Sequence, residues 1–480
     1  MGIIKDDVLN THFRVYPDQR DFADAFLHTF NINSATRINA FNTHIYSFLL
    51  SPSASVTNTF GFDDEIMLVY SPFETIEPRT IRAIESAFSQ QPFRSRANPL
   101  AFILLTECPD ATNWVEKYLL DHPQFRTPVV VNKKDLINNK LNKWYVLNRL
   151  SQQLFTRDIF DYQLPLDSDM YFFGRNKIVD EFVDAARKSQ NRGLFGLRKT
   201  GKTSVLFKVR RVLEESKIAN VIYLDCKRHD IRSQRWDELL NNITERILLS
   251  FGKKNDSFKR LGAVERFNRV VAEIGGTKNI CIIFDEIEYI SPFSKLDSHW
   301  KIDFVNIWQV FWSIQSEQRR LSIIMAGVNP YITEVDLIDG VQNPVFGIVR
   351  SSMLTGLTRD DSDRMIVRIG KQMGMVFDEK ALSYLHSRYG GHPLLTRMAC
   401  SFTNNQLTSN NIERPTQIIE KRLKERESDR DSELQFYCRH IVSELKDFYE
   451  EEYEIISMLA EGKIVEFLEF AIEPEWIKHL

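Results

Sequence analysis

The feature that most constrains how this chain folds is a glycine-rich segment, GLRKTGKTS, at residues 196–204. It matches the pattern G-x-x-x-x-G-K-[ST] in full, with an apolar stretch before it and a helix-like stretch after it. Glycines allow a tight turn in which successive backbone N–H groups point at phosphate oxygens. The segment therefore predicts a phosphate-binding P-loop between a strand and a helix.

The other residues of this segment suit the same chemistry. Lys202 places a positive charge where the β- and γ-phosphates of a nucleotide would lie, and the Thr203 hydroxyl is a typical magnesium ligand. The helix that begins near Lys202 adds the positive end of its dipole. The candidate nucleotide-binding residues of this segment are Gly196, Lys199, Thr200, Gly201, Lys202, Thr203 and Ser204.

A second motif, NICIIFDE at residues 279–286, reads as a buried strand that ends in two acids. Because the carboxyl ends of parallel strands face the ligand, we expect Asp285 to hold magnesium, directly or through water, and Glu286 to polarise the attacking water. A third apolar run, LSIIMAGVNP, carries Asn329 at its tip. This asparagine either contacts the terminal phosphate or the water, or only forms an Asn-Pro turn. The predicted catalytic residues are Glu286, Lys202 and Asn329.

Apolar strand-like runs alternate with helix-like segments along most of the chain, which predicts an α/β fold. The expected parallel strands around the P-loop are 193–196, 219–225, 279–285 and 321–327. A separate, small parallel sheet is expected from runs at 66–70, 101–106 and 128–132, and helices alone after about residue 357. The expected domains are an N-terminal α/β domain at 1–160, a P-loop core at 161–350, a helical region at 351–430 and a helical tail at 431–480.

The composition narrows the class of protein. With 480 residues, 43% hydrophobic and 26% charged, the chain is globular and long enough for two to four domains. The formal net charge of −3 gives no bulk attraction to nucleic acid, although a local basic face would still allow binding. The five cysteines form no CxxC pair, and neither a secretory signal nor a membrane span is visible. We therefore expect a cytoplasmic protein with no membrane partner.

Four motifs occur in a characteristic order: YFFGR at 171–175, GLRKTGKTS, IIFDE and YGGHPLL at 389–395. Together they resemble the STAND class of signal-transduction ATPases, close to the archaeal-ATPase-like and AAA+ types of bacterial proteins, over about residues 170–480. The resemblance implies that Gly174 and Arg175 contribute to the nucleotide cleft. It also implies that Pro393 packs near the adenine in a helical lid and that His392 senses a phosphate. Read without the resemblance, the same glycines and Pro393 form a helix C-cap followed by a helix start.

The resemblance further implies a slow, switch-like ATPase that uses ATP/ADP and Mg²⁺. ADP would hold the lid closed, and ATP would let the chain signal or assemble with copies of itself or with a partner protein, as in bacterial defence or stress responses. The tail resembles the opening helices of a winged-helix domain. Arg350 would act as an arginine finger in trans, or lie on the surface as an ordinary solvated arginine.

Two other functions fit parts of the sequence. A DNA loader or remodeller would use the lid and tail to grip DNA. A circularly permuted GTPase would use NKKD at Asn132–Asp135 for guanine, but no DxxG follows the P-loop. The N-terminal domain offers strand-end acids that resemble nuclease carboxylates, without the lysine that usually follows them, and its activity is not predicted. These acids are Asp63, Asp64, Glu65 and Glu107.

Overall fold

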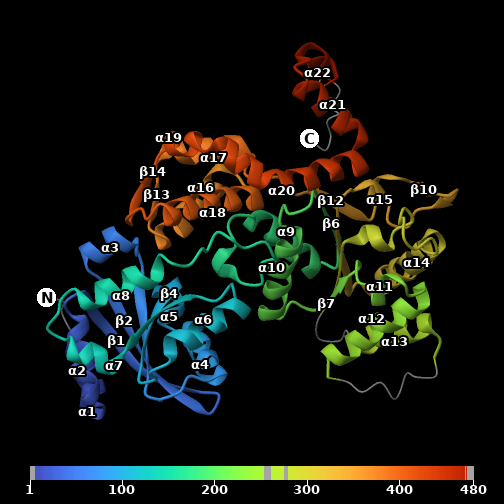
Figure 1. Ribbon diagram of the computed structural model, residues 1–480. Helices are drawn as coiled ribbons and strands as arrows, with labels where there is room; N and C mark the ends of the chain where they lie inside the picture. Colours follow the sequence, from blue (N-terminus) through green and yellow to red (C-terminus); the bar gives the residue numbers. More distant parts are fainter. Residues whose placement is uncertain (1–5, 253–260, 275–278, 471, 473–480) are drawn as a thin grey trace. The chain divides into compact units, whose positions relative to one another are not determined.

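The computed structural model describes residues 6–252, 261–274, 279–470 and 472. The chain divides into two compact units. The first unit holds residues 1–164, 359–389 and 396–431, and the second holds residues 165–358, 390–395 and 432–480. Each unit has its own five-stranded sheet (Figure 1).

The first unit is built on a sheet in the order β1-β2-β3-β4-β5. The three predicted strands are confirmed as β3 (Glu65–Ser71), β4 (Ala97–Thr106) and β5 (Thr127–Asn132), which are parallel to one another. The predicted small parallel sheet is only part of a larger, mixed sheet. A hairpin of β1 (Phe30–Ala40) and β2 (Thr43–Pro52) extends the sheet, and both of its pairings are antiparallel.

Helices cover both faces of this sheet, because successive side chains of each central strand point to opposite faces. In β4, Phe102 belongs to a core with α4 (Pro78–Phe88) and α6 (Ala111–Asp121), whereas Ile103 belongs to the core of the other face. The helices in that second core are α1 (Asp6–Val15), α2 (Arg20–Phe26), α3 (Ala54–Phe60), α7 (Lys133–Asn138) and α8 (Tyr145–Leu154).

The remainder of the first unit is mainly helical, as predicted for the region after residue 357. One short parallel ladder, β13 (Met375–Phe377) with β14 (Thr416–Ile418), interrupts the helices. The buried guanidinium of Arg430 donates to the hydroxyls of Tyr384 and Tyr389 and so ties two helices together. The helices are α16 (Arg359–Gln372), α17 (Glu379–Tyr389), α18 (Pro393–Ser409) from Thr396 on, α19 (Glu420–Glu425) and the start of α20 (Glu427–Phe448).

The second unit is built on a fully parallel sheet in the order β12-β6-β9-β8-β7. The predicted strands are confirmed as β6 (Asn191–Phe195), β7 (Ala219–Asp225), β8 (Asn279–Asp285) and β9 (Leu321–Gly327), and β12 (Val349–Met353) adds an edge. Since β9 lies between β6 and β8, the carboxyl ends of these three strands meet at one edge of the sheet. The P-loop, the acid pair and Asn329 directly follow them.

Two layers of helices bury this sheet. One core contains α9 (Asn176–Arg187) and α10 (Lys202–Glu215), and the opposite core contains α12 (Trp236–Ser250), α13 (Ala263–Ile274) and α14 (Trp300–Gln318). The tail adds the rest of α20, α21 (Glu450–Ala460) and α22 (Ile464–Phe470). The end of the predicted tail domain, residues 471 and 473–480, lies outside the described residues. In the described part of the chain, no helix combines the length and the apolar character needed to cross a bilayer.

Candidate active site

The glycine-rich segment forms a tight loop between β6 and α10. Gly196 has a φ of 148°, and a Cβ at this position would lie 2.8 Å from the carbonyl oxygen of Leu354. Gly201, the N-cap of α10, has a φ of 101°, and Lys199 has a φ of 61°. These left-handed positions turn the backbone back on itself before the helix begins, as a phosphate-binding loop requires.

The polar side chains of the loop are held by short contacts. The buried Lys202 donates from Nζ to the carbonyl oxygens of Gly196 (2.7 Å) and Leu197 (3.1 Å). The hydroxyl of Thr200 donates to the Leu197 carbonyl oxygen. Ser204 instead accepts a hydrogen bond from the backbone N–H of Leu166. Lys202 Nζ therefore lies within the P-loop, whereas the hydroxyl of Ser204 fixes the segment before β6.

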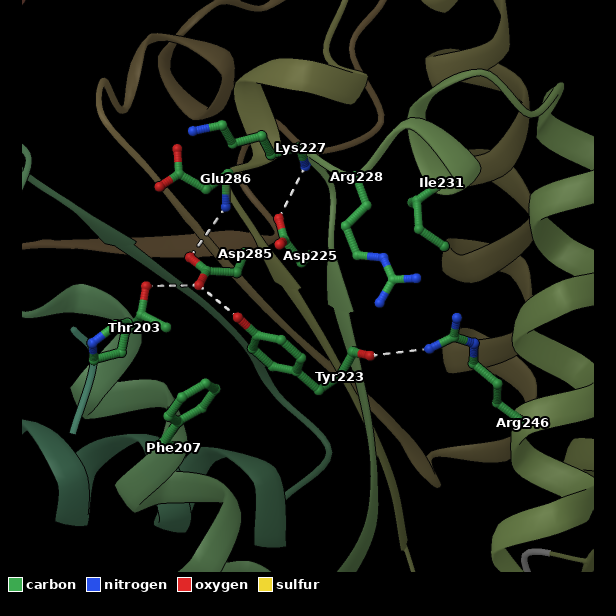
Figure 2. A pocket seen from close by; sticks show the side chains of 11 residues that line it. Thr203, Phe207, Tyr223, Asp225, Lys227, Arg228, Ile231, Arg246, Asp285 and Glu286 are labelled. Atoms are coloured by element: carbon green, nitrogen blue, oxygen red, sulfur yellow. Dashed lines mark hydrogen bonds between the residues drawn. The ribbon is translucent and has the colours of Figure 1, made fainter. Parts of the chain in front are cut away.

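The two predicted metal ligands meet across the sheet edge. The Thr203 hydroxyl donates to Asp285 Oδ2 at 2.8 Å, and the Tyr223 hydroxyl donates to the same oxygen at 2.7 Å (Figure 2). Burial raises the pKa of the Asp285 carboxyl, and the hydrogen bonds from Tyr223 and Thr203 act in the opposite direction. Tyr223 thus holds the carboxylate toward the P-loop threonine.

This donor set fits magnesium. Mg²⁺ prefers hard oxygen ligands and usually takes one or two from the protein, the rest coming from substrate phosphates and water. Thr203 Oγ1 and Asp285 Oδ2 supply a hydroxyl and a carboxylate that already lie within hydrogen-bond distance of each other. The residues that would hold the ion are therefore Thr203 and Asp285.

The predicted base, Glu286, follows Asp285 in an unusual backbone conformation. Its φ and ψ are 56° and 50°, a left-handed geometry that costs a residue with a side chain about 1–2 kcal/mol. Figure 2 shows its carboxylate directed away from the cluster of Thr203, Asp285 and Tyr223. The Glu286 N–H donates to Asp285 Oδ1 at 3.1 Å, so the turn also supports the metal ligand.

A pocket of about 390 Å³ extends from these residues over the end of β7. Its lining includes aromatic rings, positively charged lysine and arginine side chains, and the acids at the strand ends (Figure 2). Thr203, Asp285 and the predicted catalytic Glu286 line this pocket, whereas Lys202 and Asn329 are not among its lining residues. The lining residues are Pro165, Thr203, Phe207, Tyr223, Asp225, Lys227, Arg228, Ile231, Arg246, Asp285 and Glu286.

A second carboxyl beside the site, Glu288, was not singled out from the sequence. It lies in a short 3-10 helix (Ile287–Ile290) after β8, and a Cβ at Gly327 would come within 2.7 Å of its Oε2. Within the described residues neither of its buried carboxylate oxygens has a hydrogen bond of normal geometry. Burial, followed by the nearby charge of Glu286, raises the pKa of Glu288 to about 8. The sequence DEIE shows that residue 288 is an acid, but it does not predict that this acid is buried.

Glu288 should make the stability of the protein depend on pH. Between its ordinary pKa of 4.5 and about 8, the folded state keeps a proton that the unfolded state has released, so the free energy of unfolding falls as pH rises through this window. Glu288→Gln should therefore be more stable than the wild type at pH 9, by up to about 5 kcal/mol, and equal to it near pH 4. Urea unfolding followed by tryptophan fluorescence checks this, with the exposed Glu317→Gln as control. A gain that does not change with pH would contradict it.

Asn329 lies at the tip of β9, as predicted, but both polar groups of its side chain already have protein partners. Its Oδ1 accepts from the backbone N–H of Tyr331 at 2.7 Å, which is the Asn-Pro turn expected as the alternative. Its Nδ2 donates to the carbonyl oxygen of Phe448, at the end of α20. In this state the side chain is therefore committed to protein groups.

The residues implied by the resemblance also gather near the P-loop. Arg175, at the left-handed N-cap of α9 after Gly174, donates to the carbonyl oxygen of Thr355. His392 is close to the backbone of Arg198, and burial lowers the pKa of its ring to about 4, so the ring is neutral at pH 7. Its Nδ1 accepts from the Leu395 N–H.

Because Nδ1 of His392 accepts, the proton of the neutral ring is on Nε2. That Nε2 is buried and has no hydrogen bond of normal geometry within the described residues. The ring interacts with the backbone of Arg198, and a ligand oxygen within reach of Nε2 would supply a hydrogen bond of better geometry. Pro393 is the first residue of α18, the position expected for a helix-starting proline. Arg350 is exposed on the edge strand β12.

The motifs outside the second unit have local structural explanations. Asn132 caps α7, its Oδ1 accepting from the N–H groups of Lys134 and Asp135, and Lys133 bonds the side chains of Tyr70 and Glu107. The nuclease-like acids do not converge, because Glu65 begins β3 whereas Glu107 follows the parallel strand β4, at the opposite edge of the sheet. Asp63 pairs with Lys371.

Comparisons with known proteins add only distant similarities. No family model and no curated protein matches the chain. Among solved structures, a Walker-type ATPase of Pyrococcus abyssi is 17% identical with a TM-score of 0.39, covering 58% of this chain and 79% of its own. Cdc6p of Pyrobaculum aerophilum is 13% identical with a TM-score of 0.35, covering 54% and 66%. The ORC2 protein of Aeropyrum pernix, solved with ADPNP and ADP, is 12% identical with a TM-score of 0.38, covering 57% and 72%.

Proposed function

We propose that the second unit binds ATP with Mg²⁺ at Gly196–Thr203 and hydrolyses it slowly, as a switch of the STAND or AAA+ type. The observation that carries this proposal is the hydrogen bond between the Thr203 hydroxyl and Asp285 Oδ2. It joins two residues 82 positions apart, one from the P-loop and one from a strand end. A chance glycine-rich turn would not be expected to meet a buried, oriented carboxylate in this way.

The chain's own groups divide the work. The loop N–H groups and Lys202 would hold the phosphates, and the hydroxyl of Thr203 with the carboxylate of Asp285 would hold the ion, which when bound neutralises phosphate charge. Glu286 would accept the proton of the attacking water. Because its carboxylate points away from Asp285 in this structure, hydrolysis requires a rotation of this side chain, which suits a slow enzyme.

The segment Gly390–Leu395 belongs to the same unit, and its backbone contacts the residues that follow β12. The Leu357 N–H donates to the Gly391 carbonyl oxygen at 2.7 Å, and a Cβ on Gly356 would lie 2.1 Å from the Gly390 carbonyl oxygen. Two glycines therefore allow the backbones to touch. Since His392 follows directly, a nucleotide that contacts its ring would move this segment, and we propose that signalling or assembly is coupled to this movement.

Asp285→Asn should weaken binding of MgATP by about tenfold or more and leave binding of ATP without Mg²⁺ unchanged, because an amide is a poor magnesium ligand. Isothermal titration calorimetry with and without Mg²⁺ measures this. Asp225→Asn is the matched control, since Asp225 ends the neighbouring strand β7 and, in the described part of the chain, its side chain accepts from the Lys227 N–H. Equal losses with and without the ion would contradict the metal role.

The same titrations separate the alternatives. Binding of GTP much more tightly than ATP would favour the permuted GTPase. A DNA loader predicts affinity for DNA that falls steeply with salt concentration. If no purine nucleotide binds to the folded protein, the proposed function is wrong.

A further inference from the structure

The C-terminal end of α20 lies against the P-loop. Glu444 Oε2 accepts from the backbone N–H of Arg198, inside the loop, at 2.6 Å, and Glu444 Oε1 lies 2.5 Å from Nε of the same residue. The side chain of Glu444 is only 4% exposed. A carboxylate from the tail therefore accepts a hydrogen bond from one of the backbone N–H groups that a P-loop offers to phosphate oxygens.

The residues that follow Glu444 hold the neighbouring strand tip. The carbonyl oxygen of Phe448 accepts from Asn329 Nδ2, and the hydroxyl of the buried Tyr449 donates to the Val328 carbonyl oxygen at 2.5 Å. That same carbonyl oxygen accepts from the Gly196 N–H, the first amide of the P-loop, at 3.0 Å. We call Glu444, Phe448 and Tyr449 the tail clasp.

The tail clasp places a negative charge among groups that a terminal phosphate would use. Lys202 and the Arg198 guanidinium both interact electrostatically with Glu444. The Glu286 carboxylate is also close enough to repel it. A phosphate that enters here competes with the Glu444 carboxylate for the Arg198 N–H. It is also repelled by the negative charge of Glu444, which is poorly screened because the side chain is buried.

We propose that Glu444 determines nucleotide specificity at this site, favouring a diphosphate while the tail clasp is closed and yielding its position to the terminal phosphate of a triphosphate. The proposal rests on the nucleotide binding proposed above. A triphosphate brings more negative charge than a diphosphate, and its terminal phosphate would use Lys202, which interacts electrostatically with Glu444. Binding of MgATP therefore opens the clasp and frees α20 and α21, whereas ADP leaves it closed.

The test compares Glu444→Gln with the wild-type full-length chain. Glutamine keeps the shape and an acceptor for the Arg198 N–H but removes the charge. We expect its affinity for a non-hydrolysable ATP analogue with Mg²⁺ to rise about tenfold, and its affinity for ADP to change less than about threefold. Glu433→Gln is the matched control, because Glu433 is exposed on the same helix. Tyr449→Phe, which removes the hydrogen bond to Val328, should raise the affinity for the ATP analogue by about threefold.

A second measurement does not depend on affinity. Hydrogen–deuterium exchange of residues 440–455 should rise when the wild type binds the ATP analogue and stay unchanged with ADP. In Glu444→Gln without nucleotide, exchange of this segment should already be raised. Two results would overturn the specificity role, provided that both nucleotides bind the wild type. One is an equal change in the affinities for the ATP analogue and for ADP in Glu444→Gln. The other is exchange of residues 440–455 that stays the same when the wild type binds the analogue. If neither nucleotide binds the wild type, the proposed function itself fails.

Discussion

Glu286→Gln should leave MgATP bound and lower the rate of ATP hydrolysis by about 10²–10⁴-fold. An amide has nearly the shape of a carboxylate, but it does not accept the proton that the attacking water must lose. The substitution leaves the backbone unchanged, so the Glu286 N–H can still donate to Asp285 Oδ1. The metal ligands should therefore stay in place while the base is lost, and binding should separate cleanly from turnover.

Single-turnover hydrolysis of radiolabelled ATP, with calorimetry on the same preparations, measures both effects. Glu317→Gln is the control for the loss of one negative charge, since Glu317 lies exposed on α14. Wild-type turnover in Glu286→Gln would remove Glu286 from the mechanism. Loss of binding together with turnover would mean that this carboxylate supports the structure of the site instead.

Except for the edge strand β12, which is only partly buried, the parallel strands of the two five-stranded sheets could be predicted because they read as apolar runs. Strands β8 and β9 are buried along almost their whole length. The strand β1 escaped prediction because it lies at the edge of its sheet, where alternate positions are partly exposed. Its sequence, FNINSATRINA, is mostly polar and has no such run.

Thr203 and Asp285 could be predicted as a pair because each is attached to a strand end, and strand order alone brings such ends together. Glu444 and Tyr449 could not, since they reach Arg198 and Val328 from 246 and 121 residues away. Glu444 lies on α20 and Tyr449 directly after it, in a tail whose own sequence shows only amphipathic spacing. Glu288 stands between these cases. Its acidity is visible in DEIE, but its burial depends on tertiary packing against Gly327 of β9, which local sequence does not specify.

Lys202→Ala should lower the affinity for MgATP and for ADP by about 100-fold or more, to the limit of detection by calorimetry. Hydrogen bonds from an ammonium group to phosphate are charge-assisted, and each contributes about 1.5–3 kcal/mol. In the structure the Lys202 amine is buried and already held at the loop by the carbonyl oxygens of Gly196 and Leu197. Little side-chain freedom is therefore left to lose on binding, and the interaction contributes nearly its full strength.

Alanine also removes the two hydrogen bonds that Lys202 makes within the loop, so the variant needs proof that the loop persists. Its thermal unfolding without nucleotide, compared with the exposed Lys301→Ala on α14, supplies that proof. A folded Lys202→Ala that still binds ATP within tenfold of the wild type would show that the phosphates lie elsewhere. The proposed roles of Thr203 and Asp285 as metal ligands and of Glu286 as base would then also be wrong, because all three depend on a triphosphate whose terminal phosphates reach Lys202.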